Sequence, residues 1–112
     1  MAPLDKRKEE MMCRMLTTND QERFTKINRS VRIAGHSTSI RLESAFWDIL
    51  GDIARREGMS TSKMISALYL EALERHGGPT NLASMLRTFC VIYQEERHAR
   101  EALSAPYPSR TA

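Results

Sequence analysis

The residues with the clearest potential for chemistry are Ser37, Ser39 and Arg41, which alternate along the segment HSTSIRLES, residues 36–44. Side chains on a β-strand alternate between its two faces, so these three would share one face. Their hydroxyl and guanidinium groups can hydrogen-bond to a partner. The intervening residues, which would share the opposite and apolar face, are Thr38, Ile40 and Leu42. The pattern therefore predicts a strand with one buried face and one polar face.

A lone strand leaves its backbone N–H and C=O groups without hydrogen-bond partners, so this segment must pair with another strand. In a chain of 112 residues, we expect that strand to come from a second copy of the same chain. The expected assembly is therefore a homodimer in which each chain supplies a strand edge to the other.

The segment just upstream offers an alternative partner within the chain. Residues 29–35, RSVRIAG, also alternate in character, and Gly35 with His36 could form a two-residue type II′ hairpin turn. Ile33 would then lie opposite Thr38. One face would hold Val31, Ile33, Thr38 and Ile40, and the other Ser30, Arg32, Ser39 and Arg41. A single long strand with a kink or bulge at Gly35 explains the same pattern, so both alternatives stay open.

A helix is predicted directly after the strand. Its apolar residues recur with helical spacing, its first residue is capped by Glu43 or Ser44, and Gly58 is placed to end it in the left-handed conformation. The predicted apolar stripe consists of Phe46, Ile49, Leu50, Ile53 and Ala54. Trp47 lies beside this stripe, so we expect it at the edge of the core or against a second chain.

Two further helices are predicted. The second follows an N-cap at Ser60 and ends at His76, where Gly77 and Gly78 stop it. Its stripe, Ile65, Leu68, Tyr69, Ala72 and Leu73, is widened by Met64, Ala67 and Leu70. A helix so apolar is usually covered on two sides, which again favours a second chain. The third starts after Thr80 or Asn81 and runs to about Arg97.

These patterns divide the chain into four parts. Residues 1–28 form an N-terminal arm, weakly helical or disordered, in which Asp5 could cap a short helix. Residues 29–76 form the strand-and-two-helix core, and residues 77–98 an additional C-terminal helix. Residues 99–112 are polar and Pro-rich, so we expect a disordered tail. The predicted fold is mainly α with a short β ribbon.

Composition and spacing argue against several classes of function. The formal net charge of +3 permits a polyanionic partner without requiring one. Cys13 and Cys90 have no CxxC spacing, and no apolar run is long enough to span a membrane, so we expect a cytoplasmic protein with unpaired thiols. The histidines share no metal-site spacing, and no Gly-rich phosphate loop or activated nucleophile is present. We therefore expect no enzyme, no cofactor and no metal.

The order strand, helix, Gly-led turn, helix resembles the ribbon-helix-helix DNA-binding proteins over Ser37 to His76. The wider stretch RSVRIAGHSTSIRLESAFWDILGDIARREGMSTSKMISAL, with NLASMLRTF downstream, resembles a bacterial single-domain subgroup with an extended strand region and a C-terminal segment. This resemblance implies an intertwined homodimer whose paired strands enter the major groove of double-stranded DNA.

The resemblance also implies roles for individual residues. The outward residues Ser37, Ser39 and Arg41 would contact bases, with Arg41 suited to guanine O6 and N7. A DNA phosphate would bind at the N-terminus of the second helix, which here comprises Ser60, Thr61, Ser62 and Lys63. Arg32 would contact the DNA backbone. Each has a plainer alternative: Ser60 as a helix cap alone, and the arginines as solvated surface charge.

The predicted function is therefore sequence-specific DNA binding by a transcriptional regulator. The alternative is a protein-interaction module of the antitoxin type, which would hold a partner protein through the arm, the C-terminal helix and the tail. A third hypothesis is a small-molecule pocket between the second and third helices. One difficulty stays open: a hairpin in each chain would give the dimer four strands, which the major groove does not readily accept.

Overall fold

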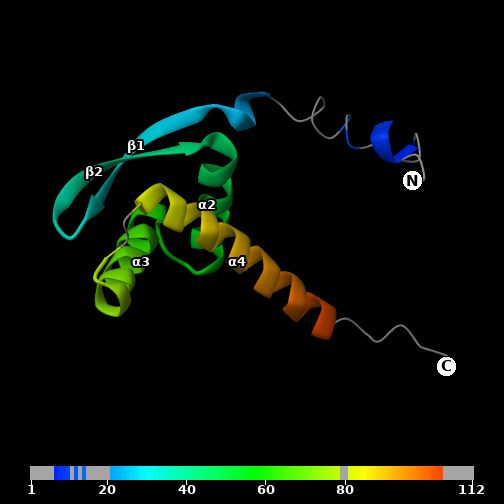
Figure 1. Cartoon of the computed structure of the whole chain (residues 1–112). Coiled ribbons are helices and arrows are strands. Elements are labelled where there is room, and N and C mark those ends of the chain that lie inside the picture. Colours follow the sequence, from blue (N-terminus) through cyan, green and yellow to red (C-terminus); the bar gives the residue numbers. More distant parts are fainter. Residues whose placement is uncertain (1–6, 11, 13, 15–20, 79–80, 105–112) are drawn as a thin grey trace.

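In the computed structural model, a two-stranded hairpin lies over three helices (Figure 1). The structure describes residues 7–10, 12, 14, 21–78 and 81–104. The elements in chain order are η1 (Gln21–Phe24), β1 (Lys26–Ile33), β2 (His36–Glu43), α2 (Ser44–Arg56), α3 (Thr61–His76) and α4 (Leu82–Ser104). Among the described helices, none has the length and hydropathy needed to cross a bilayer.

The strand β2 pairs antiparallel with β1 of the same chain, from Lys26 opposite Glu43 to Ile33 opposite His36. The hairpin alternative is therefore confirmed, and the predicted pairing with a second copy, which would use the other edge of β2, stays a prediction. The single long strand with a bulge is excluded. The alternating pattern also starts earlier than predicted, because residues 26–28, assigned to the arm, belong to β1.

The turn between the strands consists of Ala34 and Gly35, not Gly35 and His36. Both have positive φ, 50° and 82°, which fits a type I′ turn rather than the predicted type II′. Val31, not Ile33, therefore lies opposite Thr38. The change moves the turn by one residue, so cross-strand partners shift by two and every side chain keeps its predicted face.

The apolar face of the hairpin packs on the helices and forms one core with them. The buried apolar residues are Val31, Ile33, Ile40, Leu42, Trp47, Leu50, Ile53, Ala54, Met64, Ile65, Leu86 and Cys90. α3 packs against β1, while α4 packs against α2 and β2. The core thus draws on every strand and on all three of these helices.

Trp47 is a core residue rather than an edge residue. It is 4% exposed, and its indole Nε1 donates a hydrogen bond to the Ile27 carbonyl oxygen at 2.9 Å. The Arg29 guanidinium lies 5.3 Å from the centre of the indole ring. The predicted stripe residues Phe46 and Ile49 are only half-buried. The buried face of α2 is therefore rotated toward Trp47, because the indole satisfies its polar N–H on β1 while filling the core.

The predicted helix signals at Ser60, Gly58, Gly77 and Asn81 are confirmed. The Ser60 hydroxyl accepts a hydrogen bond from the Lys63 N–H at 3.1 Å, and the Asn81 side chain accepts one from the N–H three residues later at 3.0 Å. Gly58 and Gly77 have φ of 70° and 75°. These left-handed glycines let two helices end sharply.

The C-terminal end of the chain differs from the prediction, whereas the described part of the N-terminal arm agrees with the short helix predicted there. α4 continues to Ser104, so residues 99–104 are helical although they were assigned to the disordered tail. An ion pair between Arg97 and Glu101, 3.1 Å apart at i,i+4, supports this extension, which projects away from the other helices (Figure 1). Residues 7–10, 12 and 14 of the arm are helical. The predicted cap Asp5 and residues 105–112 lie outside the described residues.

An ion pair ties α4 to the end of β2. Arg87 donates hydrogen bonds from Nε and Nη2 to Glu43 Oε1, at 3.0 and 2.8 Å, and its guanidinium lies 6.0 Å from the Phe46 ring centre. A hydrogen bond from its own backbone N–H and the hydrogen bonds from Arg87 lower the pKa of Glu43. The contact is partly shielded from water, so it fixes α4 against the hairpin more firmly than a surface pair would.

Replacing Ala34 by Asn should stabilise the protein. An L-residue in the left-handed region costs about 1–2 kcal/mol, and Asn tolerates that region best, with Asn-Gly the preferred type I′ pair. We expect a gain of about 0.5–1 kcal/mol in the free energy of unfolding, measured by urea denaturation. Ala34→Val should instead lose stability, since a β-branched residue is strained at positive φ. A gain from Val, or a loss from Asn, contradicts the turn assignment.

Arg87→Met should cost about 1 kcal/mol of stability at pH 7, because Glu43 loses a charged hydrogen-bond partner. The folded-state pKa of Glu43 lies below 4.5, so its contribution is present above that pH and is lost as the pH falls through the lower value. The gap between variant and wild type should narrow below pH 4.5. The matched control is Arg75→Met, which removes an exposed i,i+4 pair with Glu71 and should cost less. Equal, pH-independent losses contradict this account.

Candidate nucleic-acid interface

The outer surface of the hairpin, here called the polar face, gathers the predicted base-contact residues. Because the strands alternate, it takes every second residue of each strand. Its members are Lys26, Asn28, Ser30 and Arg32 from β1 and Ser37, Ser39, Arg41 and Glu43 from β2. All are exposed except Glu43, which is half-buried. Ser37, Ser39 and Arg41 therefore lie in one row, as the strand pattern predicted.

Cross-strand pairing places each β2 residue of the polar face beside a β1 residue. Arg32 lies opposite Ser37, and Asn28 lies opposite Arg41. The hydroxyls of Ser30 and Ser37 are hydrogen-bonded to each other. Within the described part of the chain, the guanidinium groups of Arg32 and Arg41 form no ion pair, so both remain available to an external acceptor.

Each strand has one open edge, because the sheet formed by the described residues has two strands. In a hairpin with a two-residue turn, Ile33 and His36 form a hydrogen-bonded pair. Every second pair along the ladder from there is hydrogen-bonded as well. The backbone groups of Ser37, Ser39 and Arg41 therefore point away from β1, toward the open edge of β2. This row can accept another strand.

The two edges differ in charge. The strand β1 carries three cations, Lys26, Arg29 and Arg32, and no acidic residue. The strand β2 carries one positive charge, at Arg41, and one negative charge, at Glu43. Like charges on facing strands are destabilising, and positive side chains commonly protect an open edge from pairing. The charge pattern therefore favours strand addition at β2 over β1.

The predicted phosphate site lies at the first turn of α3. Ser60, Ser62 and Lys63 are exposed there, while Thr61 is half-buried. The Ser60 hydroxyl serves as the helix cap, and no acidic residue lies in the first turn. The structure thus brings the four residues together at a helix end that favours anions, and the capping role of Ser60 is established.

The sequence did not predict the helix residues that bond to the hairpin and fix its position on the helices. Trp47 and Arg87 hold the open end of the hairpin, Trp47 through Ile27 on β1 and Arg87 through Glu43 on β2. Tyr93 adds a contact from α4 to the end of α2, since its hydroxyl donates to Glu57 Oε1 at 3.0 Å. The spacing of residues along the chain gave no sign of these long-range contacts.

Cys90 is a core residue without a disulfide partner. Burial raises the pKa of its thiol to about 11, so the reactive thiolate is scarce at neutral pH. Cys13 lies outside the described residues. Among the residues that the structure describes, no three His, Cys, Asp or Glu side chains come together to hold a metal ion.

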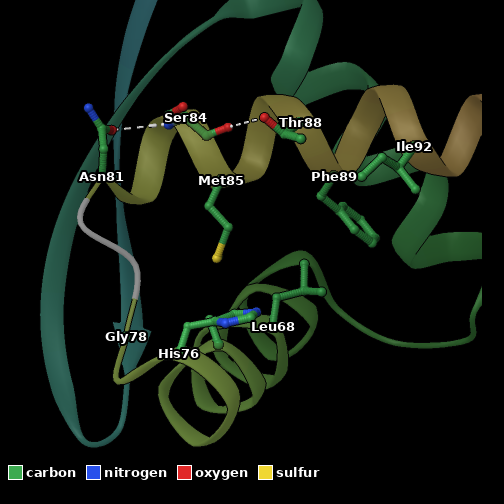
Figure 2. Close-up of a pocket in the computed structure, with 10 residues that line it drawn as sticks. Leu68, His76, Gly78, Asn81, Ser84, Met85, Thr88, Phe89 and Ile92 are labelled. Atoms are coloured by element: carbon green, nitrogen blue, oxygen red, sulfur yellow. Dashed lines mark hydrogen bonds between the residues drawn. The ribbon is translucent and has the colours of Figure 1, made fainter.

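A hollow of about 460 Å³ lies between α3 and α4 (Figure 2). Its apolar lining includes Leu68, Met85 and Phe89, and His76 lies at its α3 side. The polar side chain of Asn81 accepts a hydrogen bond from the Ser84 N–H, and that of Thr88 donates one to the Ser84 carbonyl. These two contacts use the Asn81 carbonyl oxygen and the Thr88 hydroxyl proton, and the remaining surface of the hollow is mainly apolar.

Comparison with known proteins assigns the family. A ribbon-helix-helix domain matches residues 26–94, which takes in the hairpin and all three helices in whole or in part. A solved structure of an uncharacterized protein from Bordetella pertussis Tohama I is 36% identical, with a TM-score of 0.74 over 90% of this chain and 82% of that one. No curated protein matches the sequence. By its fold and its sequence, the chain belongs to the ribbon-helix-helix family.

Proposed function

We propose that the protein is a homodimeric transcriptional regulator that binds double-stranded DNA in a sequence-specific manner. The observation that carries the proposal is the row of exposed side chains Ser37, Ser39 and Arg41 beside an open strand edge. Membership of the ribbon-helix-helix family supports it, because such domains are typical of DNA-binding regulators. In this proposal the protein is a non-enzymatic bacterial protein of the cytoplasm.

The dimer forms by pairing β2 with β2 of a second copy. The open edge of β2 and its balanced charge favour this seam. Antiparallel pairing about Ser39 would place Ser37 opposite the partner's Arg41, with no like charges facing each other. Leu70 and Leu73 on α3 are 47% and 45% exposed, which leaves apolar surface of the kind that a partner commonly covers.

The bases are contacted by the β2 row. Arg41 binds guanine O6 and N7 with its two parallel N–H groups, a contact worth about 1–3 kcal/mol of discrimination. Ser37 and Ser39 donate or accept hydrogen bonds and discriminate less. Phosphates are held by Arg32 and by the first turn of α3, whose members are Ser60, Thr61, Ser62 and Lys63.

The test is selection of bound fragments from random or genomic duplex DNA, followed by affinity measurements on the selected site. Arg41→Ala should reduce specific affinity by at least about tenfold, since a dimer loses two base contacts. The matched control is Arg100→Ala, which removes one exposed cation from α4 and should leave affinity almost unchanged. Light scattering checks that both variants stay dimeric. Failure to select any site, or equal affinity for both variants, contradicts the proposal.

The alternative function, binding of a protein partner, has one observation in its favour. The hollow between α3 and α4 is mainly apolar, and Ile92, which lines it, is 49% exposed. An amphipathic helix could lie there with its apolar side chains inward. If this is the main function, a stoichiometric protein should co-purify with the wild type and Arg41→Ala and be lost from Ile92→Glu, with no DNA site selected. A selected DNA site that depends on Arg41 contradicts it.

A further inference from the structure

We propose that the two β1 strands of the dimer lie over the DNA backbones that border the major groove, while only the two β2 strands enter it. In each chain, Lys26 and Arg32 would contact phosphates of the DNA backbone beneath its own β1. The two chains together would contact both backbones that border the groove. The inference rests on the proposed function and adds a role for β1.

The first step is the width of the sheet. Pairing β2 with its copy gives four strands in the order β1-β2-β2-β1, because β1 already occupies the other edge of β2. Neighbouring strands lie about 4.8 Å apart, so the β2 axes lie about 2.4 Å from the dimer axis and the β1 axes about 7 Å from it. The major groove is about 12 Å wide, or about 6 Å on each side of its centre. The β1 strands therefore lie beyond the groove opening, above its walls.

The second step is the chemistry of β1. Its four residues on the polar face, Lys26, Asn28, Ser30 and Arg32, are all exposed and include no acidic group. Each can donate a hydrogen bond, which suits an anionic backbone. Lys26 and Arg32 are six residues apart, so at about 3.3 Å per residue their attachment points are about 20 Å apart. They would contact separate phosphates.

The third step is the contrast with the rest of the strand. Arg29, the other β1 cation, belongs to the opposite face and lies over the Trp47 ring, so it serves the fold. The β2 row, in contrast, combines two hydroxyls with one guanidinium. The hairpin thus separates two tasks: β2 distinguishes sequences, and β1 supplies affinity that is independent of sequence. Four strands are then compatible with a groove that admits two.

The experiment compares Lys26→Ala, Arg32→Ala and Arg41→Ala with the control Arg100→Ala, on the selected site and on a scrambled duplex across a salt series. Each β1 variant should bind both duplexes more weakly than the wild type, by a similar factor for each duplex. It should also reduce the slope of log K against log salt by about two, because a dimer loses two phosphate contacts at about 0.9 each. Arg41→Ala should mainly reduce the ratio of the affinity for the selected site to the affinity for the scrambled duplex. Circular dichroism and light scattering confirm fold and dimer.

A second measurement locates the contact on the DNA. Neutral methylphosphonate linkages at the phosphates bordering the groove should weaken binding by the wild type. They should have little further effect on binding by the double variant that combines Lys26→Ala and Arg32→Ala. The inference is overturned if the β1 variants have the same affinity and salt slope as Arg100→Ala. It is also overturned if they change the ratio of the affinities for the selected and scrambled duplexes, because β1 would then contact bases. In both cases a loss in Arg41→Ala leaves the proposed function standing. Failure of the wild type to bind any duplex overturns both.

Discussion

The pairing of β1 with β2 decides which side chains of the hairpin face the helices and which face the solvent. Because strand side chains alternate, a slip of one residue in β2 would expose Leu42 and bury Arg41. The structure resists such a slip at the open end of the ladder, away from the turn. Trp47 holds β1 through the Ile27 carbonyl, and Ser44 donates its backbone N–H to the Thr25 carbonyl at 2.8 Å. The exposed row on β2 is therefore a consequence of packing on the other side of the sheet.

The C-terminal helix contributes to the same constraint. Leu86 and Cys90 are buried in the core, and Arg87, between them in the chain, reaches Glu43 at the end of β2. Arg41 lies two residues upstream of that contact. A helix outside the strand-and-two-helix core thus helps to hold a candidate base-contact residue in place. Its last residues, 94–104, are largely exposed and extend beyond the core.

Much of the local structure could be predicted from the sequence, because its causes are local. The alternation of residues 36–43 fixed the two faces of β2, and the signals at Ser60, Gly58, Gly77 and Asn81 marked helix ends. The choice between a hairpin and one long strand stayed open because pairing depends on the whole chain, and the turn was placed one residue too late because Gly suits several turn types. The roles of Trp47 and Arg87 depend on residues 20 and 44 positions away. Of the site, the predicted row was placed correctly, whereas its DNA contacts remain proposals.

The most direct measurement of the central claim is amide hydrogen exchange along β2, followed by NMR in the free protein. Alternate amides point to β1, so those of Thr38, Ile40 and Leu42 exchange slowly in any case. If a second copy pairs with the open edge of β2, the amides of Ser37, Ser39 and Arg41 should be protected as well, and dilution should remove that protection first. Rapid exchange of these three amides at high protein concentration would contradict a dimer built on β2.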